Sequence, residues 1–343
     1  MPTSDALGRP LGVLRLSLTA RCNLACTYCL PEGTEPPGLL NLQQRLAVIR
    51  AAVELGASNL RLTGGEPLLS AQLEELVAGA QGLRRLGLQT IALTSNGLLL
   101  TAERAKSLRR AGLDRITLSL DGTTGASVAR MAGLPDATAG ERSLSRVLEA
   151  IEHARAAGFD PERGALKLNA VIQRGRNDDQ LIPLAQLARE RSLELRLIEY
   201  MDVGNRNSWQ PTDVVPATEM LRTIDGHWSL EPLGRPEHGT AARWRYRDGA
   251  GSLAVVASVS QPFCGDCNRL RVTADGVAYT CLFAAPGQGL DLRPWLQENS
   301  SSEGLQDAMA QLWQQRSDRY SEERHHRRSE QPAPRAEMAY LGG

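Results

Sequence analysis

Lysine is almost absent from this sequence. It occurs only at positions 106 and 167, so arginine carries nearly all of the positive charge. An excess of either sign is absent too, because Lys plus Arg and Asp plus Glu both total 39 among the 343 residues. This balance argues against non-specific nucleic-acid binding, which needs a surplus of positive charge. It leaves room for a basic pocket that binds one small anion.

Long apolar runs are also lacking. No stretch approaches the roughly 20 apolar residues that span a bilayer, and the first ten residues contain no apolar signal-peptide core. We therefore expect a cytoplasmic protein that does not associate with a membrane. Thiols stay reduced in that compartment, so grouped cysteines usually serve metal binding or catalysis there.

Short strands and helical patterns alternate through the first two hundred residues, with no solenoid-type repeat. This order predicts an α/β fold with a parallel sheet or barrel. The expected strands begin near Val13, Asn59, Thr90, Arg115, Ala165 and Glu194. Apolar stripes predict helices over residues 42–53, ended by Gly56, and over residues 144–154, ended by Gly158. Thr101 is the expected N-cap of another helix.

The expected strands alternate between apolar and polar residues, whereas buried parallel strands usually have continuous apolar runs. Leucines alternate with Arg15 and Ser17 in the first strand, and Arg61, Lys167 and Arg196 interrupt later strands in the same way. If the apolar faces pack on helices, the polar faces meet inside the sheet. An interior with at least four cationic side chains suits an enclosed anionic ligand. For any single strand, the alternative is an exposed edge with one face in water.

The pattern changes after about residue 205. Strands are expected at 242–247, 252–259, 269–273 and 277–282, with Asp275-Gly276 as a hairpin turn. We divide the chain into a partial barrel, residues 1–205, and a C-terminal region, residues 206–343. The polar segment 300–336 is expected to form a solvated helix and a flexible end.

Six cysteines occur in two groups of three. They are Cys22, Cys26 and Cys29, and Cys264, Cys267 and Cys281. A structural zinc site needs four ligands, and neither group has a fourth Cys or a nearby His at the usual spacing. Three thiolates can instead hold a [4Fe–4S] cluster and leave one iron open to a small molecule. Antiparallel pairing across the expected hairpin would bring Cys281 beside Cys267.

The spacing C-x3-C-x2-C directly after the first strand, with Tyr28 before the last cysteine, resembles the motif of the radical S-adenosylmethionine superfamily. Gly64-Gly65-Glu66-Pro67 after the second strand fits the same resemblance. It implies a cluster whose open iron chelates S-adenosylmethionine and, once reduced, releases a 5′-deoxyadenosyl radical. The cofactor contacts that it implies are Tyr28, Gly65, Ser119 and Met201. For Met201, a place in the core is the alternative.

A second resemblance covers nearly the whole chain. CNRLRVT at 267–273, CLF at 281–283, RLSLTARCN at 15–23 and the terminal Gly342-Gly343 resemble the GTP 3′,8-cyclase family of molybdenum cofactor biosynthesis. The resemblance implies an incomplete (βα)6 barrel whose C-terminal region carries a second [4Fe–4S] cluster. In that family the radical abstracts hydrogen from C3′ of GTP, and the carbon radical then attacks C8. The product, 3′,8-cyclo-7,8-dihydro-GTP, passes to a cyclic pyranopterin monophosphate synthase.

The same resemblance assigns residues to the substrate. The implied GTP contacts are Arg15, Arg61, Thr94, Lys167, Arg269, Leu270 and Arg271, and the implied catalytic residues are Arg269, Arg271, Gly342 and Gly343. GTP would then bind without a Walker A loop, which the sequence lacks. A cellular reductant is implied, and a homodimer is left open. The chain departs from many relatives at Ser70 and Ala71, where they carry basic residues.

Two other functions compete with this interpretation. Another radical enzyme with an auxiliary cluster, such as a peptide-modifying maturase, would usually have more C-terminal cysteines. A non-catalytic electron carrier with two clusters would generally coordinate every iron with protein ligands. Such a carrier would need no barrel lined with arginines.

Overall fold

A single sheet of twelve strands organises the computed structural model, which describes residues 2–31, 33–298, 301–327 and 334–343. The first six strands run parallel in chain order: β1 (Val13–Ser17), β2 (Asn59–Thr63), β3 (Thr90–Ser95), β4 (Arg115–Ser119), β5 (Leu166–Ile172) and β6 (Glu194–Glu199). Each begins within one residue of its predicted start. The predicted parallel α/β architecture is confirmed.

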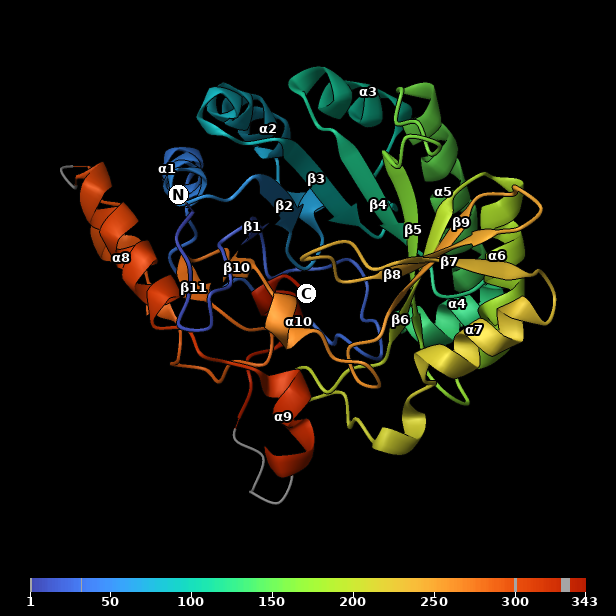
Figure 1. Cartoon of the computed structure of the whole chain (residues 1–343). Coiled ribbons are helices and arrows are strands. Elements are labelled where there is room, and N and C mark those ends of the chain that lie inside the picture. Colours follow the sequence, from blue (N-terminus) through green and yellow to red (C-terminus); the bar gives the residue numbers. More distant parts are fainter. Residues whose placement is uncertain (1, 32, 299–300, 328–333) are drawn as a thin grey trace.

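Helices follow most of these strands and lie around the outer side of the curved sheet (Figure 1). They are α1 (Leu42–Glu54), α2 (Leu73–Gln81), α3 (Ala102–Ala111), α4 (Gly125–Ala132), α5 (Ala137–Ala156), α6 (Leu181–Glu190) and α7 (Ala217–Asp225). Thr101 caps α3 as predicted, because its side chain accepts a hydrogen bond from the backbone N of Arg104. The helix ends at Gly112, whose φ of 104° is left-handed.

Residues 206–343 extend the sheet at both edges. Beside β1 lie β10 (Arg269–Val272), β11 (Val277–Tyr279) and β12 (Leu290–Asp291); beside β6 lie β9 (Ser252–Val256), β8 (Ala242–Tyr246) and β7 (Leu230–Gly234). The predicted hairpin joins β10 to β11, and Gly276 in its turn has a left-handed φ of 88°. The sequence did not predict β7 and β12.

The hydrophobic core lies between the sheet and the helices. Leu14, Leu16, Leu60 and Leu62 are buried there together with Ile49 of α1. Neighbouring residues of a strand point to opposite faces. The polar residues between these leucines therefore face away from the helices, as the alternation predicts.

Within segment 300–336 the predicted helix is present, but its expected full solvation is wrong for the residues that the structure describes. Helix α8 (Ser302–Gln314) packs on α1 and buries Leu305, Met309 and Trp313. Their four-residue spacing gives the helix one apolar stripe among polar neighbours. Helix α9 (Tyr320–Arg327) follows, and α10 (Met338–Leu341) lies near the C-terminus at the centre of the view (Figure 1). The rest of this prediction concerns residues 300 and 328–333, outside the described part of the chain.

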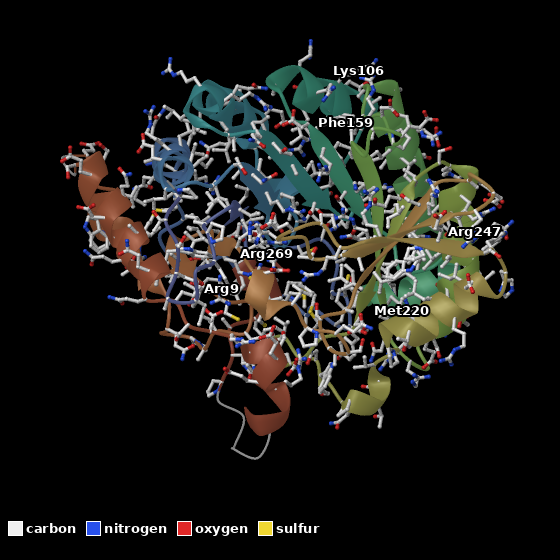
Figure 2. The ribbon with its side chains drawn as sticks, in the orientation of Figure 1. Arg9, Lys106, Phe159, Met220, Arg247 and Arg269 are labelled. Atoms are coloured by element: carbon white, nitrogen blue, oxygen red, sulfur yellow. The ribbon has the colours of Figure 1, made fainter. Side chains whose placement is uncertain are left out.

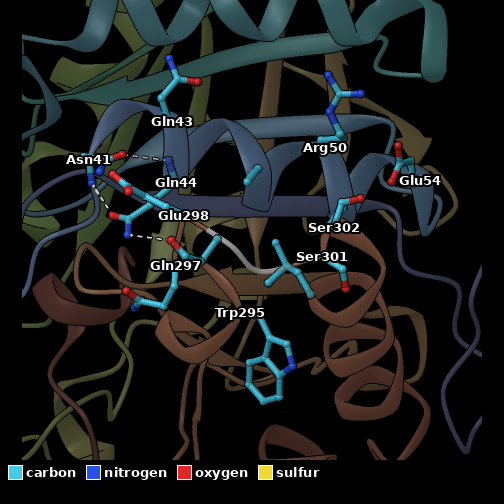
Figure 3. A pocket seen from close by; sticks show the side chains of 14 residues that line it. Asn41, Gln43, Gln44, Arg50, Glu54, Trp295, Gln297, Glu298, Ser301 and Ser302 are labelled. Carbon is cyan, nitrogen blue, oxygen red and sulfur yellow. Dashed lines mark hydrogen bonds between the residues drawn. The ribbon is translucent and has the colours of Figure 1, made fainter.

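An outer groove of about 960 Å³ lies between α1 and the segment that leads into α8 (Figure 3). Amide and charged side chains line it, among them Gln43, Arg50 and Gln297. Gln44 Nε2 crosses the contact and donates a hydrogen bond to the Leu296 carbonyl oxygen at 3.1 Å. The residues predicted for cofactor and substrate lie elsewhere. None of the described helices is long and apolar enough to cross a membrane.

Candidate functional site

Three arginines lie side by side on neighbouring strands. Arg271 of β10 is the register partner of Arg15 on β1, which is in turn the partner of Arg61 on β2. Arg269, two residues before Arg271, shares its strand face. Like charges at directly opposed positions destabilise a sheet. Among the described residues, no Asp or Glu side chain forms an ion pair with any of these four arginines. The row is therefore arranged for an anion.

Burial and mutual repulsion make the charged form of the arginine row unfavourable. Burial, together with the charge of neighbouring arginines, lowers the pKa of Arg61 to about 9 and that of Arg271 to about 10. The same causes, burial first and then Arg271 and Arg61, hold the pKa of Arg15 well below its usual range. A bound anion would reverse this repulsion, since an opposite charge favours the charged form.

A cavity of about 190 Å³ opens over this row, and we call it the arginine cavity. Its lining includes Arg15, Arg61, Thr94, Asn169, Arg196, Met201, Phe263, Cys264, Cys267, Arg269, Arg271, Cys281, Arg316 and Gly343. Figure 2 shows Arg269 in the middle of the molecule, whereas the exposed Lys106 lies at its rim. Asn169, Arg196 and Arg316 were not among the residues that the family resemblance assigned to cofactor or substrate, although the strand alternation had placed Arg196 inside the sheet. The polar alternation of β5 and β6 could have identified Asn169 and Arg196 as site residues. No local sequence pattern identifies Arg316.

The second cysteine group borders the arginine cavity. Cys281 lies with Cys264 and Cys267 in its lining, as the predicted hairpin required. The loop that carries the latter two is held by arginines from both ends of the chain. Arg9 Nη1 donates to the Cys264 carbonyl oxygen at 2.8 Å, and Arg316 Nη1 donates to that of Cys267 at 2.5 Å. The loop that carries Cys264 and Cys267 is therefore braced from two sides.

The charges around this group favour an anionic sulphur at Cys267 but not at Cys281. Burial opposes ionisation of Cys267, but Arg269 and Arg316 outweigh it and lower the pKa of this thiol to about 7. Burial and the nearby Asp318 raise the pKa of Cys281 to about 12. Iron would remove that penalty, because a metal deprotonates a coordinating thiol. The donor set fits an iron–sulphur cluster.

A second cavity, of about 130 Å³, adjoins the first, and we call it the cofactor cavity. Tyr28, Ser119 and Met201, three of the four predicted cofactor contacts, line it. Its lining shares Thr94, Asn169, Ile198, Met201 and Gly343 with the arginine cavity. The two cavities are therefore neighbours with a common wall.

Asp121 is a lining residue of the cofactor cavity that the sequence analysis missed. The Tyr28 hydroxyl donates to its Oδ2 at 2.8 Å, and the backbone N of Val171 donates to its Oδ1 at 2.8 Å. Burial raises the pKa of Asp121 to about 6. Asp121 follows Ser119 by two residues, just past the end of β4, and this position could have identified it as a site residue from the sequence. The hydrogen bond ties the cysteine loop to the neighbouring strands.

The first cysteine group lies in the loop after β1. Burial raises the pKa of Cys26 well above its usual range, and Asp121, Cys29 and Cys22 raise it further. Burial and Cys22 raise the pKa of Cys29 to about 12. These thiols thus repel one another when ionised, a repulsion that a cationic cluster relieves. Across the described residues, no three Cys, His, Asp or Glu side chains are close enough for a single metal ion. The ligands of a four-iron cluster stand farther apart.

The Gly64-Gly65 pair packs against backbone. A Cβ on Gly65 would stand 2.1 Å from the Arg21 carbonyl oxygen, and one on Gly64 would stand 2.5 Å from that of Thr19. Gly65 N donates to the Thr19 oxygen at 2.8 Å. The glycines therefore let β2 support the segment that leads into Cys22. A contact of Gly65 with the cofactor stays a prediction.

The C-terminal glycines lie against the arginine row. Arg15 Nε donates to the Gly342 oxygen at 3.1 Å, and Arg15 Nη2 donates to a Gly343 oxygen at 2.7 Å. Gly342 has a left-handed φ of 67°, and a Cβ there would stand 2.6 Å from Cγ2 of Thr63. Gly343 lines both cavities. The tail therefore lies at their junction.

Two predicted substrate residues lie outside the arginine cavity. The Leu270 side chain is fully buried in the core, because it points to the opposite face of β10 from Arg269 and Arg271. The Leu270 side chain therefore faces away from the arginine cavity, and a contact of this residue with GTP stays a prediction. Lys167 shares its face of β5 with Asn169, but its Nζ lies 2.6 Å from Oε1 of Glu194 in a buried ion pair. Its contact with GTP stays a prediction.

Two family models match the chain. The Radical SAM superfamily model covers residues 16–188, and the Molybdenum Cofactor Synthesis C model covers residues 193–322. The GTP 3′,8-cyclase of Synechococcus sp. strain CC9902 is 60% identical over 340 residues, which cover 99% of this chain and 98% of the relative. The GTP 3′,8-cyclase of Acidothermus cellulolyticus is 45% identical over 334 residues, covering 94% and 88%.

Solved structures share the fold. Streptococcus suis SuiB bound to S-adenosylmethionine superposes with a TM-score of 0.61 at 13% identity, covering 87% of this chain and 68% of that one. SuiB bound to its precursor peptide SuiA gives a TM-score of 0.62, covering 89% and 64%. With the full-length sequence relatives, the cysteine motif and both family models, these likenesses lead to one assignment: the chain belongs to the GTP 3′,8-cyclase family of radical S-adenosylmethionine enzymes.

Proposed function

We propose that this family member binds GTP in the arginine cavity, between two [4Fe–4S] clusters, and cyclises it there between C3′ and C8. The observation that carries the proposal is the buried row Arg61–Arg15–Arg271, which has no Asp or Glu partner among the described residues. A triphosphate supplies the negative charge that this row lacks. The neighbouring cofactor cavity supports a reaction between two bound molecules across a common wall.

Cys22, Cys26 and Cys29 would hold the first cluster, and the cofactor cavity would hold S-adenosylmethionine. When bound, these two groups supply the radical that starts the reaction. The chain positions them: Asp121 orients Tyr28, and the Gly64-Gly65 turn supports the backbone before Cys22. Ser119 and Met201 lie on the cavity wall beside the expected adenosine.

Cys264, Cys267 and Cys281 would hold the second cluster, whose open iron would be available to bind the substrate. Arg9 and Arg316 brace the loop that carries the first two. Thr94, Asn169 and Arg196 then complete the polar wall around the nucleotide. Residues 1–205 would hold the cofactor and contribute Arg15 and Arg61 to the substrate site, and residues 206–343 would hold the auxiliary cluster and complete the substrate site. The product would pass to a cyclic pyranopterin monophosphate synthase, and a cellular reductant would supply the electron.

Replacing Arg61 or Arg15 by alanine should weaken GTP binding about 10- to 100-fold, because a charge-assisted contact to phosphate contributes about 1.5–3 kcal/mol. Anaerobic equilibrium binding of GTP would measure the change. Arg245→Ala is the matched control, since Arg245 pairs with Glu231 on an exposed strand and its side chain is 58% exposed. If Arg61→Ala, Arg15→Ala and the control bound GTP with equal affinity, the arginine row would not be part of the GTP site.

Cys281→Ala should abolish GTP cyclisation while S-adenosylmethionine is still cleaved without coupling. Cys281 lines the arginine cavity and not the cofactor cavity, so its loss removes substrate positioning and spares the first cluster. Chromatography of 5′-deoxyadenosine and of the cyclised nucleotide measures both activities in one sample. Cys26→Ala, in the other group, should lose both. Normal cyclisation by Cys281→Ala would contradict the second cluster site.

Anaerobic reconstitution with iron and sulphide, followed by incubation with S-adenosylmethionine, dithionite and GTP, tests the whole proposal. We expect 5′-deoxyadenosine and the 3′,8-cyclised nucleotide. Cofactor cleavage with GTP left intact would indicate another radical enzyme with an auxiliary cluster. Two bound clusters without any cleavage would indicate an electron carrier.

A further inference from the structure

The buried carboxylate of Asp202 forms hydrogen bonds with several C-terminal segments near the cofactor cavity. Asp202, just after β6, accepts a hydrogen bond from the Tyr320 hydroxyl at 2.6 Å and one from Arg324 Nε at 3.0 Å. Arg335 Nη1 donates to its Oδ2 at 3.0 Å and also to its backbone oxygen. The side chain of Asp202 is 9% exposed. One carboxylate thus connects the end of β6 to α9 and to the segment before α10.

The same loop fixes the chain that leads into the terminal glycines. Asn205 and Arg335 pair through two hydrogen bonds: Asn205 Nδ2 donates to the Arg335 oxygen at 2.6 Å, and Arg335 N donates to Asn205 Oδ1 at 3.1 Å. Asn205 N donates to Glu337 Oε1 at 3.1 Å, and Glu337 is the N-cap of α10. After this short helix only Gly342 and Gly343 remain, so the position of residues 335–337 decides where Gly343 lies.

This loop also touches the cofactor side. Met201, next to Asp202, lines both cavities. Arg206 Nη1 donates to the carbonyl oxygen of Leu30, the residue after Cys29, at 3.3 Å. Residues 201–206 therefore contact the cofactor cavity, the first cysteine loop and the tail. We call them the tail-holding loop.

We propose that Asp202 is a positioning residue that keeps the terminal glycines at the junction of the two cavities. The inference rests on the proposed role of Gly342-Gly343 in GTP cyclisation. Asp202 contacts neither cavity itself, so it acts through Arg335. Other contacts also hold the tail, since the Tyr340 hydroxyl donates to Asp275 Oδ2 at 3.1 Å and Ala336 N donates to the Ala284 oxygen at 3.0 Å. Loss of the Asp202 charge should therefore displace the tail partially.

Asp202→Asn keeps the size of the side chain and removes its charge. We expect GTP cyclisation to fall about tenfold, because the charge-assisted contact of Asp202 with Arg335 is weakened, while formation of 5′-deoxyadenosine changes less than about twofold. Arg335→Gln breaks the same contact from the tail side and should give the same ratio of products. Asp248→Asn is the control, because it removes a carboxylate from an ion pair with Arg189 and its side chain is 52% exposed.

The ratio of cyclised nucleotide to 5′-deoxyadenosine separates positioning from simple stabilisation. A residue that only stabilises the fold would lower both products together and leave the ratio unchanged. An unchanged ratio in both Asp202→Asn and Arg335→Gln would overturn the proposal. A variant without Gly342-Gly343, assayed in parallel, shows whether the Asp202 proposal or the proposed role of the tail has failed. If only this deletion variant loses the coupling of cofactor cleavage to GTP cyclisation, the tail acts without Asp202. If it also retains coupling, the proposed role of the tail fails as well.

Discussion

Replacing Cys22, Cys26 and Cys29 by alanine is expected to abolish cleavage of S-adenosylmethionine and to remove about half of the iron from the reconstituted protein. Two [4Fe–4S] clusters hold roughly eight irons, and each cysteine group accounts for one cluster. The groups are independent, because the first lies in the loop after β1 and the second lines the arginine cavity. Iron analysis and chromatography of 5′-deoxyadenosine give the two measurements.

The opposite triple variant is the matched control. Alanine at Cys264, Cys267 and Cys281 should remove the other half of the iron and leave cofactor cleavage. Production of 5′-deoxyadenosine by the variant without Cys22, Cys26 and Cys29 would falsify the assignment of the first cluster. Full iron content in both triple variants would reject the two-cluster proposal.

Deleting Gly342-Gly343 is expected to abolish formation of the cyclised nucleotide, with iron content and cofactor cleavage largely intact. Gly342 and Gly343 accept hydrogen bonds from Arg15, and Gly343 lies where the two cavities meet. Deletion would open the common wall and release Arg15 from the tail. Neither glycine contacts the first cysteine group by any described hydrogen bond, so radical generation should continue.

A point substitution makes this test sharper. Gly342→Ala adds a Cβ that would stand 2.6 Å from Cγ2 of Thr63, in a left-handed conformation that alanine rarely adopts. Gly249→Ala, at φ +81° with nothing within 4 Å of the added Cβ, carries the same backbone strain without the clash. We expect loss of coupling in Gly342→Ala alone. Normal GTP conversion by the deletion variant would indicate that the tail is a frayed chain end without a role in the reaction.

Sequence patterns did not predict how deeply the C-terminal segments are buried. Helix α10 packs on the C-terminal region, where Leu341 is buried with Tyr279 and Ala284. The surrounding polar stretch predicted a solvated helix, yet Trp313, Arg316 and Arg324 are buried. Composition could not reveal this burial, because these arginines are satisfied by carbonyl oxygens and carboxylates from distant segments, such as Cys267 and Asp202.

Local periodicity was sufficient wherever the determining interaction is local. The alternation of β1 and β2 predicted which side chains face the helices, since successive residues of a strand point to opposite sides. The Asp275-Gly276 turn predicted the hairpin that brings Cys281 beside Cys267. The same alternation rule, applied to β10, places the Leu270 side chain in the core. The sequence analysis instead followed the family resemblance, which assigned Leu270 to GTP.

The sequence by itself determined the strands, their polar and apolar faces and the two cysteine groups, because each depends on residues close together in the chain. Only the tertiary structure decided that β10 pairs in parallel with β1, which sets Arg271 beside Arg15. It alone paired Lys167 with Glu194 and gathered Tyr320, Arg324 and Arg335 around Asp202. Such contacts join segments up to about 250 residues apart, and no local spacing records them. They depend on the packing of the whole chain.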